Sequence, residues 1–172
     1  MNRTVIIQAS SRSDGDTAEV VKYLTSISGY DIIDLNTKNI GHYDYEYRNK
    51  DDDFIPLMTY IIDNYDTIVF ATPVYWYTMS GILKVFFDRI SDLLRTHKDT
   101  GRRLRGKNMA MISASNHDDL KSGFSMPFEE SANYLGMQYL GDVHTYIEDG
   151  VINSDVQLRL QNFNKTISKQ SI

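Results

Sequence analysis

A polar stretch near the start of the chain carries the side chains best suited to hold an anion. Residues 10–17 read SSRSDGDT and lead from an apolar run into a predicted helix. Free N–H groups and the positive end of a helix dipole favour a phosphate at such a place. The stretch lacks the Gly-Lys-Ser/Thr of a Walker loop, and with Gly15 alone it lacks the dinucleotide fingerprint. It therefore predicts a monophosphate site with these donors: Ser10, Ser11, Arg12, Ser13 and Thr17.

The alternative for this stretch is a solvated turn followed by a helix N-cap, because Ser, Asp and Gly are common turn residues. Asp16 fits poorly beside a phosphate, so we expect it to cap the helix or to orient a neighbour. Asp16 or Thr17 is the expected N-cap.

A second stretch, in the middle of the chain, places aromatic side chains where a strand should pass into a helix. Residues 68–71 are apolar without alternation, which is typical of a strand buried on both faces, and Pro73 should end it. A helical pattern of apolar residues begins at residues 80–81 and runs to residue 94. Between them stand Tyr75, Trp76 and Tyr77. Such turns lie at the edge of a sheet, so we expect a wall for a flat ligand, or else a subunit contact.

Composition limits the classes of protein that remain. The 172 residues fit one domain, residues 1–172, and the net charge of −5 argues against nucleic acid as the main partner. The absence of cysteine removes disulfides, thiolate metal sites, Cys-ligated iron–sulfur clusters and a cysteine nucleophile. The four histidines are scattered without ligand spacing, so no metal site is expected. No signal peptide or membrane span is visible, and the expectation is a cytoplasmic protein.

Strand and helix patterns alternate along the chain. The expected strands are residues 4–9, 30–35, 68–71, 108–113 and a stretch within 137–147; the expected helices are 18–26, 54–64, 80–94, 124–135 and 155–168. This alternation predicts a parallel sheet with helices on both faces. In such sheets ligands bind beyond the carboxyl ends of the strands, where the strand order reverses. The loops after the first, third and fourth strands, the last of them residues 114–122, should therefore gather at one edge.

The two loop sequences together resemble a known family. SSRSDGDT after the first strand and TPVYWYTMSG…KVFFDR after the third resemble the flavodoxin-like NAD(P)H-dependent flavin reductases, including their iron–sulfur flavoprotein relatives. The resemblance covers nearly the whole chain, and its second motif is the specific part. It implies a flavodoxin-like doubly wound α/β fold, with five parallel strands in the order 2-1-3-4-5.

The resemblance also implies FMN as the cofactor and NAD(P)H as a co-substrate. It puts the FMN phosphate at Ser10, Arg12, Gly15, Asp16 and Thr17. It puts the ribityl chain and the ring at Thr72, Pro73, Val74, Tyr75, Trp76 and Tyr77. Residues 113–117 would form the third flavin-facing loop, with Ser113, Ala114, Ser115 and His117 as cofactor contacts. Relatives often have Asn where Asp16 stands, and the cluster cysteines of the iron–sulfur relatives are absent, so we expect flavin alone.

The expected function is electron transfer from reduced nicotinamide, through flavin, to a flavin, quinone or other small acceptor. The flavin carries the redox chemistry, so no side chain is expected as an obligatory acid or base. A homodimer or tetramer is expected. The alternative is a flavodoxin-type one-electron carrier. A phosphorelay receiver is rejected, because residues 71–73 read Ala-Thr-Pro where it needs an acceptor aspartate.

Two segments keep two interpretations each. Tyr43, Tyr45 and Tyr47 either cover the flavin of a partner subunit or belong to a loose surface loop. The basic residues of 95–107 either contact the extra phosphate of NADPH or form a solvated connector.

Overall fold

One parallel sheet organises the chain. The computed structural model describes residues 3–148 and 150–169. Its strands are β1 (Thr4–Gln8), β2 (Asp31–Asp34), β3 (Thr67–Pro73), β4 (Asn108–Ser115) and β5 (Gln138–Tyr146). Within the described residues these strands form one five-stranded sheet in the order β2-β1-β3-β4-β5, and each neighbouring pair is parallel. The predicted strand order is confirmed.

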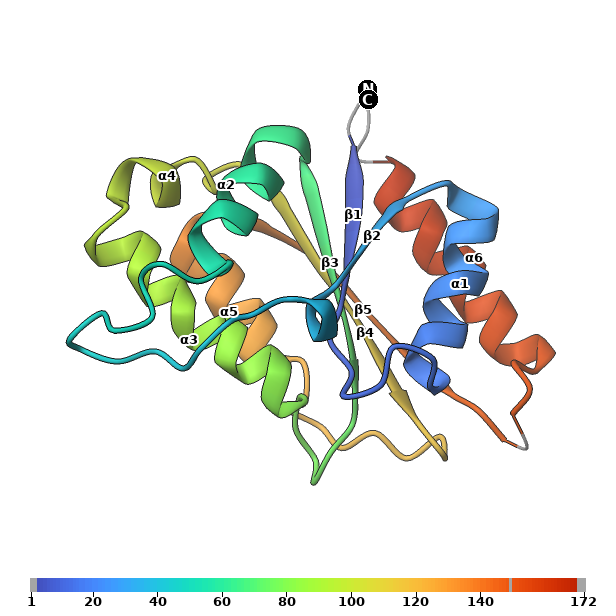
Figure 1. Cartoon of the computed structure of the whole chain (residues 1–172). Coiled ribbons are helices and arrows are strands. Elements are labelled where there is room, and N and C mark those ends of the chain that lie inside the picture. Colours follow the sequence, from blue (N-terminus) through green and yellow to red (C-terminus); the bar gives the residue numbers. More distant parts are fainter. Residues whose placement is uncertain (1–2, 149, 170–172) are drawn as a thin grey trace.

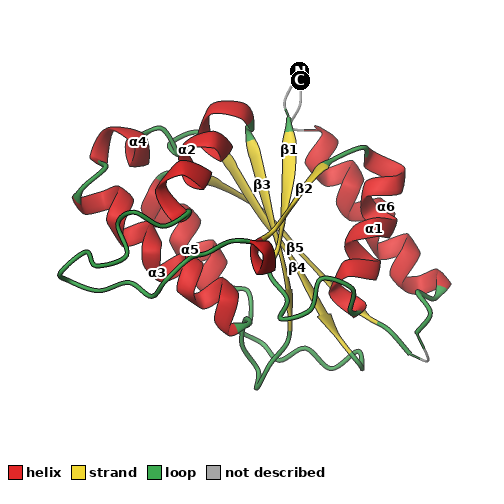
Figure 2. Ribbon diagram, in the orientation of Figure 1, coloured by secondary structure: helices red, strands yellow, loops and turns green. Residues whose placement is uncertain are grey.

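Helices cover both faces of this sheet, as Figures 1 and 2 show. They are α1 (Asp16–Ser28), α2 (Phe54–Asn64), α3 (Gly81–Arg95), α4 (Lys98–Arg102), α5 (Met126–Leu135) and α6 (Ser154–Lys169), with a short 3₁₀ turn η1 (Leu35–Thr37) after β2. Apolar side chains of α1 and α6 pack on one face, and those of α2, α3 and α5 pack on the other.

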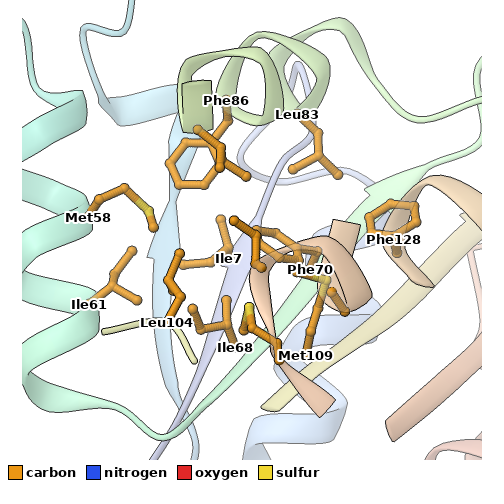
Figure 3. Packing of buried hydrophobic residues seen from close by; sticks show 14 of the residues in the cluster. Ile7, Met58, Ile61, Ile68, Phe70, Leu83, Phe86, Leu104, Met109 and Phe128 are labelled. Atoms are coloured by element: carbon orange, nitrogen blue, oxygen red, sulfur yellow. The ribbon is translucent and has the colours of Figure 1, made fainter. Parts of the chain in front are cut away.

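The central strands explain this two-sided packing. Successive strand side chains point to opposite faces, so Val5 and Ile7 join the core under α2, α3 and α5, whereas Ile6 joins the core under α1 and α6. Figure 3 shows Ile7 and Phe70 among the side chains of the first core. All seven residues of β3 are buried, as its unbroken apolar run predicts.

The start of α1 differs from the prediction. The helix begins at Asp16, two residues before the expected Ala18, and its N-cap is Gly15. The predicted caps, Asp16 and Thr17, were wrong, because both residues already belong to the first helical turn. The carbonyl of Gly15 accepts the first bonds of the helix, from the amides of Ala18 (2.8 Å) and Glu19 (3.1 Å).

Strand β4 is two residues longer than predicted. It continues through Ala114 and Ser115, which were expected in the loop, because both of its neighbours offer partners there. Ala114 pairs with Pro73 of β3, and Ser115 pairs with Tyr146 of β5. The backbone amide of Val74 extends this contact by donating to the carbonyl of Ala114 at 2.8 Å.

Two other segments were also predicted incompletely. The basic stretch 95–107 contains α4, which was not expected; α4 packs so closely on α3 that a Cβ at Gly101 would lie 2.5 Å from the carbonyl oxygen of Leu93. Helix α5 begins at Met126 rather than at Phe124, with Pro127 in its first turn, where proline is favoured.

The loops that follow β1, β3 and β4 leave the sheet at the same edge, at the bottom of Figure 1. This is the edge where the strand order reverses, since β1 is followed by β2 on one side and its other neighbour is β3. The predicted gathering of the three loops is confirmed.

Candidate functional site

The three loops enclose one cavity of about 470 Å³. This volume lies within the range of roughly 300–1,000 Å³ that is typical of small-molecule sites. Thirteen of the seventeen residues predicted from the sequence line it: Ser10, Arg12, Gly15, Asp16, Thr17, Pro73, Val74, Tyr75, Trp76, Tyr77, Ala114, Ser115 and His117. Three segments far apart in the sequence thus form one site.

The first loop presents positive charge at the start of α1. The Arg12 guanidinium folds over Gly15, so that a Cβ there would lie 3.1 Å from Arg12 Nη2. A guanidinium and the positive end of a helix dipole repel each other, and a bound anion offsets this repulsion. Among the described residues, no carboxylate forms an ion pair with Arg12. This donor set fits a phosphate.

Hydrogen bonds hold the backbone of this loop in a curve. Gln8 Nε2 donates to the carbonyl of Ser13 at 3.3 Å, and the amide of Arg12 donates to Ser10 Oγ at 3.4 Å. Ser13 Oγ accepts from Asn36 Nδ2, and Ser11 Oγ shares a hydrogen bond of 3.1 Å with the Tyr75 hydroxyl. Ser11 and Ser13, both predicted donors, therefore do not line the cavity and instead tie the loop to its neighbours.

The second loop is a tight turn with unusual residues at its centre. Tyr75 and Thr78 exchange two backbone hydrogen bonds of 2.9 and 3.1 Å. The residues between them, Trp76 and Tyr77, have φ angles of 49° and 65°. This is the geometry of a type I′ turn, where Asn and Gly are usual because bulky residues are strained at positive φ. We call residues 75–78 the aromatic turn.

The aromatic turn leaves its rings in solvent. Trp76 is 91% exposed and Tyr77 is 67% exposed, while both residues line the cavity. The expected position of these aromatics at the surface is confirmed. Strain combined with exposed apolar surface is costly in the free chain, and such combinations cluster at ligand sites.

Buried hydroxyl groups fix the base of the aromatic turn. Thr72 Oγ1 accepts from the amide of Ser80 at 3.0 Å. Ser80 Oγ donates to the carbonyl of Ala9 at 2.6 Å and accepts from the amide of Leu83, which caps α3. Thr72, a predicted cofactor contact, is thus buried and does not line the cavity; it holds Ser80, whose hydroxyl in turn reaches the end of β1.

The third loop lines the cavity with more residues than the sequence predicted. Ser113 is fully buried and does not line the cavity, in contrast to the prediction for it. Five further residues line it: Asn116, Asp119, Leu120, Lys121 and Phe124. Four of them fall in the predicted loop, residues 114–122, and this position was the available signal; Phe124 was instead expected at the start of a helix.

A buried guanidinium holds the other tyrosine-rich part of the chain, which we call the tyrosine segment (residues 39–53). Arg89 of α3 forms ion pairs with Asp52 and Asp92, and it donates to the carbonyls of Gly41 and Asn49. Burial alone raises the pKa of Asp52, but hydrogen bonds from Arg89 and from backbone amides outweigh it and lower that pKa. Arg89 stands in the KVFFDR motif, whose sequence does not by itself indicate this role.

The basic connector does not reach the cavity. None of residues 95–107, all of which the structure describes, lines it. Arg102 instead pairs with Asp99, and Arg103 pairs with Asp63. The arrangement of this chain therefore gives the connector no contact with a ligand in the cavity.

Over residues 3–148 and 150–169, no group of three or more His, Cys, Asp or Glu side chains is placed to hold a metal ion. Over the same residues, no helix has the length and apolar character needed to span a membrane.

Fold and cavity together define a flavodoxin-like α/β protein with a cavity at the switch point of its sheet. The chain belongs to the NADPH-dependent FMN reductase family, whose model matches residues 2–150. A Bacillus subtilis protein, YwqN, named as an NAD(P)H-dependent FMN-containing oxidoreductase, is 26% identical over 153 residues, which cover 82% of this chain and 83% of YwqN.

Solved structures support the fold. An FMN-dependent NADH-azoreductase from Bacillus anthracis, solved with FMN, is similar with a TM-score of 0.67 at 16% identity, over 99% of this chain and 100% of that one. Oxidised flavodoxin 1 from Bacillus cereus is similar with a TM-score of 0.65 at 13% identity, over 96% of this chain and 97% of that one. An enzyme and a flavodoxin match almost equally well, so the fold by itself does not separate the two functions.

Proposed function

We propose that this chain binds FMN in the three-loop cavity and transfers electrons from NAD(P)H to a small acceptor such as a flavin or a quinone. The observation that carries the proposal is the convergence of a phosphate-type donor set, at Arg12 and Gly15, with the aromatic turn on one cavity.

The donor set of the first loop suits the phosphate end of the cofactor. The amides of Asp16 and Thr17 stand in the first turn of α1, where helix N–H groups have no carbonyl partner. The Arg12 guanidinium adds a charge-assisted donor on the same side. The hydroxyls of Ser10 and Thr17 complete a set that a phosphate with several acceptor oxygens would use.

The aromatic turn suits the ring end. Trp76 and Tyr77 offer flat apolar faces that are exposed in the free chain, and a stacked ring would remove this surface from water. Elsewhere in the cavity lining, Ser115 and His117 offer polar groups for the edge of a ring.

FMN, when bound, supplies the redox chemistry itself. The task of the chain is then to hold the phosphate, to orient the ring and to leave one face open to the nicotinamide and to the acceptor. No side chain of the cavity is required as an acid or base. The relatedness to YwqN supports this reading, as does the FMN held by the structurally similar azoreductase. A homodimer or tetramer, in which the tyrosine segment contacts the neighbouring site, is part of the proposal.

A direct test of the phosphate contact uses Arg12→Ala. Removing a hydrogen bond to a charged group costs about 1.5–3 kcal/mol, so we expect FMN to bind roughly 10- to 100-fold more weakly. Riboflavin, which lacks the phosphate, should bind equally to both forms. Arg102→Ala serves as the matched control, since Arg102 is exposed, pairs with Asp99 and does not line the cavity. Unchanged FMN affinity in Arg12→Ala would contradict the assignment of the phosphate end.

Anaerobic mixing with NADH or NADPH tests the enzyme. We expect the reduced nicotinamide to bleach the bound flavin and a small acceptor to restore its colour. The second candidate, a one-electron carrier, draws on the flavodoxin likeness and on the exposure of Trp76, which would let a large partner dock. For a carrier, neither nicotinamide would bleach the flavin, whereas a reductase partner would.

A further inference from the structure

The segment that leaves β4 is held from behind by two side chains with no assigned role. Residues 115–118, which we call the β4 exit segment, contribute Ser115, Asn116 and His117 to the wall of the cavity. The back of the same segment faces β5 and α6, which supply His144 and Arg159.

His144 forms hydrogen bonds through both ring nitrogens, to the β4 exit segment and to Ser113 just before it. Its Nε2 lies 3.1 Å from the carbonyl oxygen of His117 and 3.4 Å from Ser115 Oγ. Its Nδ1 lies 2.8 Å from Ser113 Oγ, which is fully buried. A carbonyl oxygen only accepts, so Nε2 carries the proton and donates to His117 O, and in the neutral ring Nδ1 accepts from the Ser113 hydroxyl.

The carbonyl of His117 is the point where these contacts meet. Ser115 Oγ donates to it at 2.6 Å, and the amide of His117 donates back to Ser115 Oγ at 3.3 Å. With His144 on its other side, this carbonyl is held by two donors. The orientation of the peptide group after His117 is therefore set by His144 and Ser115 together.

Arg159 holds the next residue along the segment. Its Nη1 and Nη2 donate to the two carboxylate oxygens of Asp118, at 2.9 and 2.7 Å. Its Nε pairs with Asp155 one helical turn earlier, at 2.8 Å, and its guanidinium lies over the ring of Tyr146. The hydrogen bonds from Arg159 lower the pKa of Asp118, so this contact persists across neutral pH.

We infer that His144 is a positioning residue for the cavity: its Nε2–H fixes the His117 carbonyl, and thereby the wall that would face the edge of the flavin ring. The inference rests on the proposed function for the identity of the ligand. His144 itself does not line the cavity, so it acts through the β4 exit segment and not by contact.

The physical reason is the conformational entropy that the β4 exit segment loses when a ligand binds. A loop that is ordered before binding loses little conformational freedom when the ligand arrives, whereas a loosened loop must be ordered at the expense of affinity. Loss of the bond from Nε2 should therefore weaken FMN binding without removing any group that touches FMN.

Two substitutions of His144 distinguish the role of Nε2 from that of Nδ1. In His144→Gln, the amide nitrogen can occupy the position of Nε2 and donate to His117 O, so we expect FMN affinity within about twofold of the parent chain. In His144→Asn, the shorter side chain can replace Nδ1 only, and we expect FMN to bind about three- to tenfold more weakly, the usual effect of one hydrogen bond. His97→Asn, at an exposed histidine outside the cavity, is the matched control.

Hydrogen exchange in the ligand-free chain gives a readout that does not depend on FMN. We expect amides of residues 116–121 to exchange faster in His144→Asn than in His144→Gln, with unchanged exchange in β1 and β3. Equal exchange and equal FMN affinity in the two variants would overturn the inference. If the parent chain bound no FMN, the proposed function would fail, while the exchange comparison would still decide the role of His144.

Discussion

The aromatic turn and the tyrosine segment are both irregular, both rich in tyrosine, and built on opposite principles. The tyrosine segment is fastened to α3 by Arg89, a side chain with only 1% of its surface exposed. The aromatic turn has Trp76 at its centre, and this residue is 91% exposed and strained at a φ of 49°. The segment also has one residue at positive φ, Tyr47 at 55°, but this residue lies between several anchored backbone groups.

The difference separates a structural task from a binding task. Buried ion pairs with several hydrogen bonds make a region rigid, and their loss is costly to the fold. Strain and exposed apolar surface destabilise the free chain, and they persist where a ligand gains from them. We therefore expect substitutions of the buried ion pairs that anchor the tyrosine segment to change stability, and substitutions in the aromatic turn to change binding.

The largest expected effect follows from Arg89→Met, which keeps the length of the side chain and removes its charge. Asp52 and Asp92 would then be buried without their cation, so we expect a loss of about 3–5 kcal/mol in the free energy of unfolding. Urea denaturation measures it. Arg95→Met, at an exposed position on the same helix, should change stability by less than about 1 kcal/mol. A loss below about 1 kcal/mol for Arg89→Met would remove the contrast between the two regions.

A smaller effect should appear in acid. The pKa of Asp52 is lower in the folded chain than its unfolded value of about 3.9. Its contribution to stability is therefore present above that value and is lost as the pH falls through the folded pKa. Urea midpoints measured from pH 6 to pH 3 should fall below about pH 4. In Asp52→Asn, which cannot titrate, this part of the pH dependence should be absent. If the urea midpoint of this variant changed with pH as in the parent chain, the pH dependence would come from other carboxylates.

The smallest expected effect on stability has the opposite sign. Trp76→Asn combined with Tyr77→Gly puts the usual type I′ residues into the aromatic turn. Relief of strain should stabilise the chain by about 1 kcal/mol and raise Tm by roughly 2–4 °C, while FMN affinity falls. Trp76→Ala is the control, because it removes the ring but keeps a side chain at positive φ. It should weaken FMN binding without raising Tm, and a rise in both variants would show that strain is not the cause.

Much of the architecture could be predicted from local patterns. The apolar run of β3 has no polar residue to face solvent, so it predicts a strand covered on both sides, as the structure has it. The grouping of three loops at one edge followed from the parallel topology. Boundaries were less predictable: β4 runs to Ser115 because β3 and β5 both extend far enough to pair with it, which depends on neighbours that are distant in sequence.

Within the site, the sequence predicted which types of residue are present better than it predicted which side chains face the cavity. Thr72 and Ser113 have the right chemistry for a ligand, but in the structure their hydroxyls bond to Ser80 and His144 and turn away from the cavity. Strand residues alternate between faces, so one position decides whether a hydroxyl meets the ligand or the core. The sequence does not mark that position at the end of a strand.

The sequence by itself determined the alternation of strands and helices, the buried centre of the sheet and the composition of the loops at its carboxyl edge. These features depend on periodicity and on local preferences, which act between near neighbours in the chain. The tertiary structure alone decided that Arg89 meets Asp52 and that His144 stands behind the wall of the cavity. A charge or a hydrogen-bond donor finds its partner among the groups that folding brings within a few ångströms. Which distant groups these are depends on the path of the chain between them, and neither residue's type reveals that path.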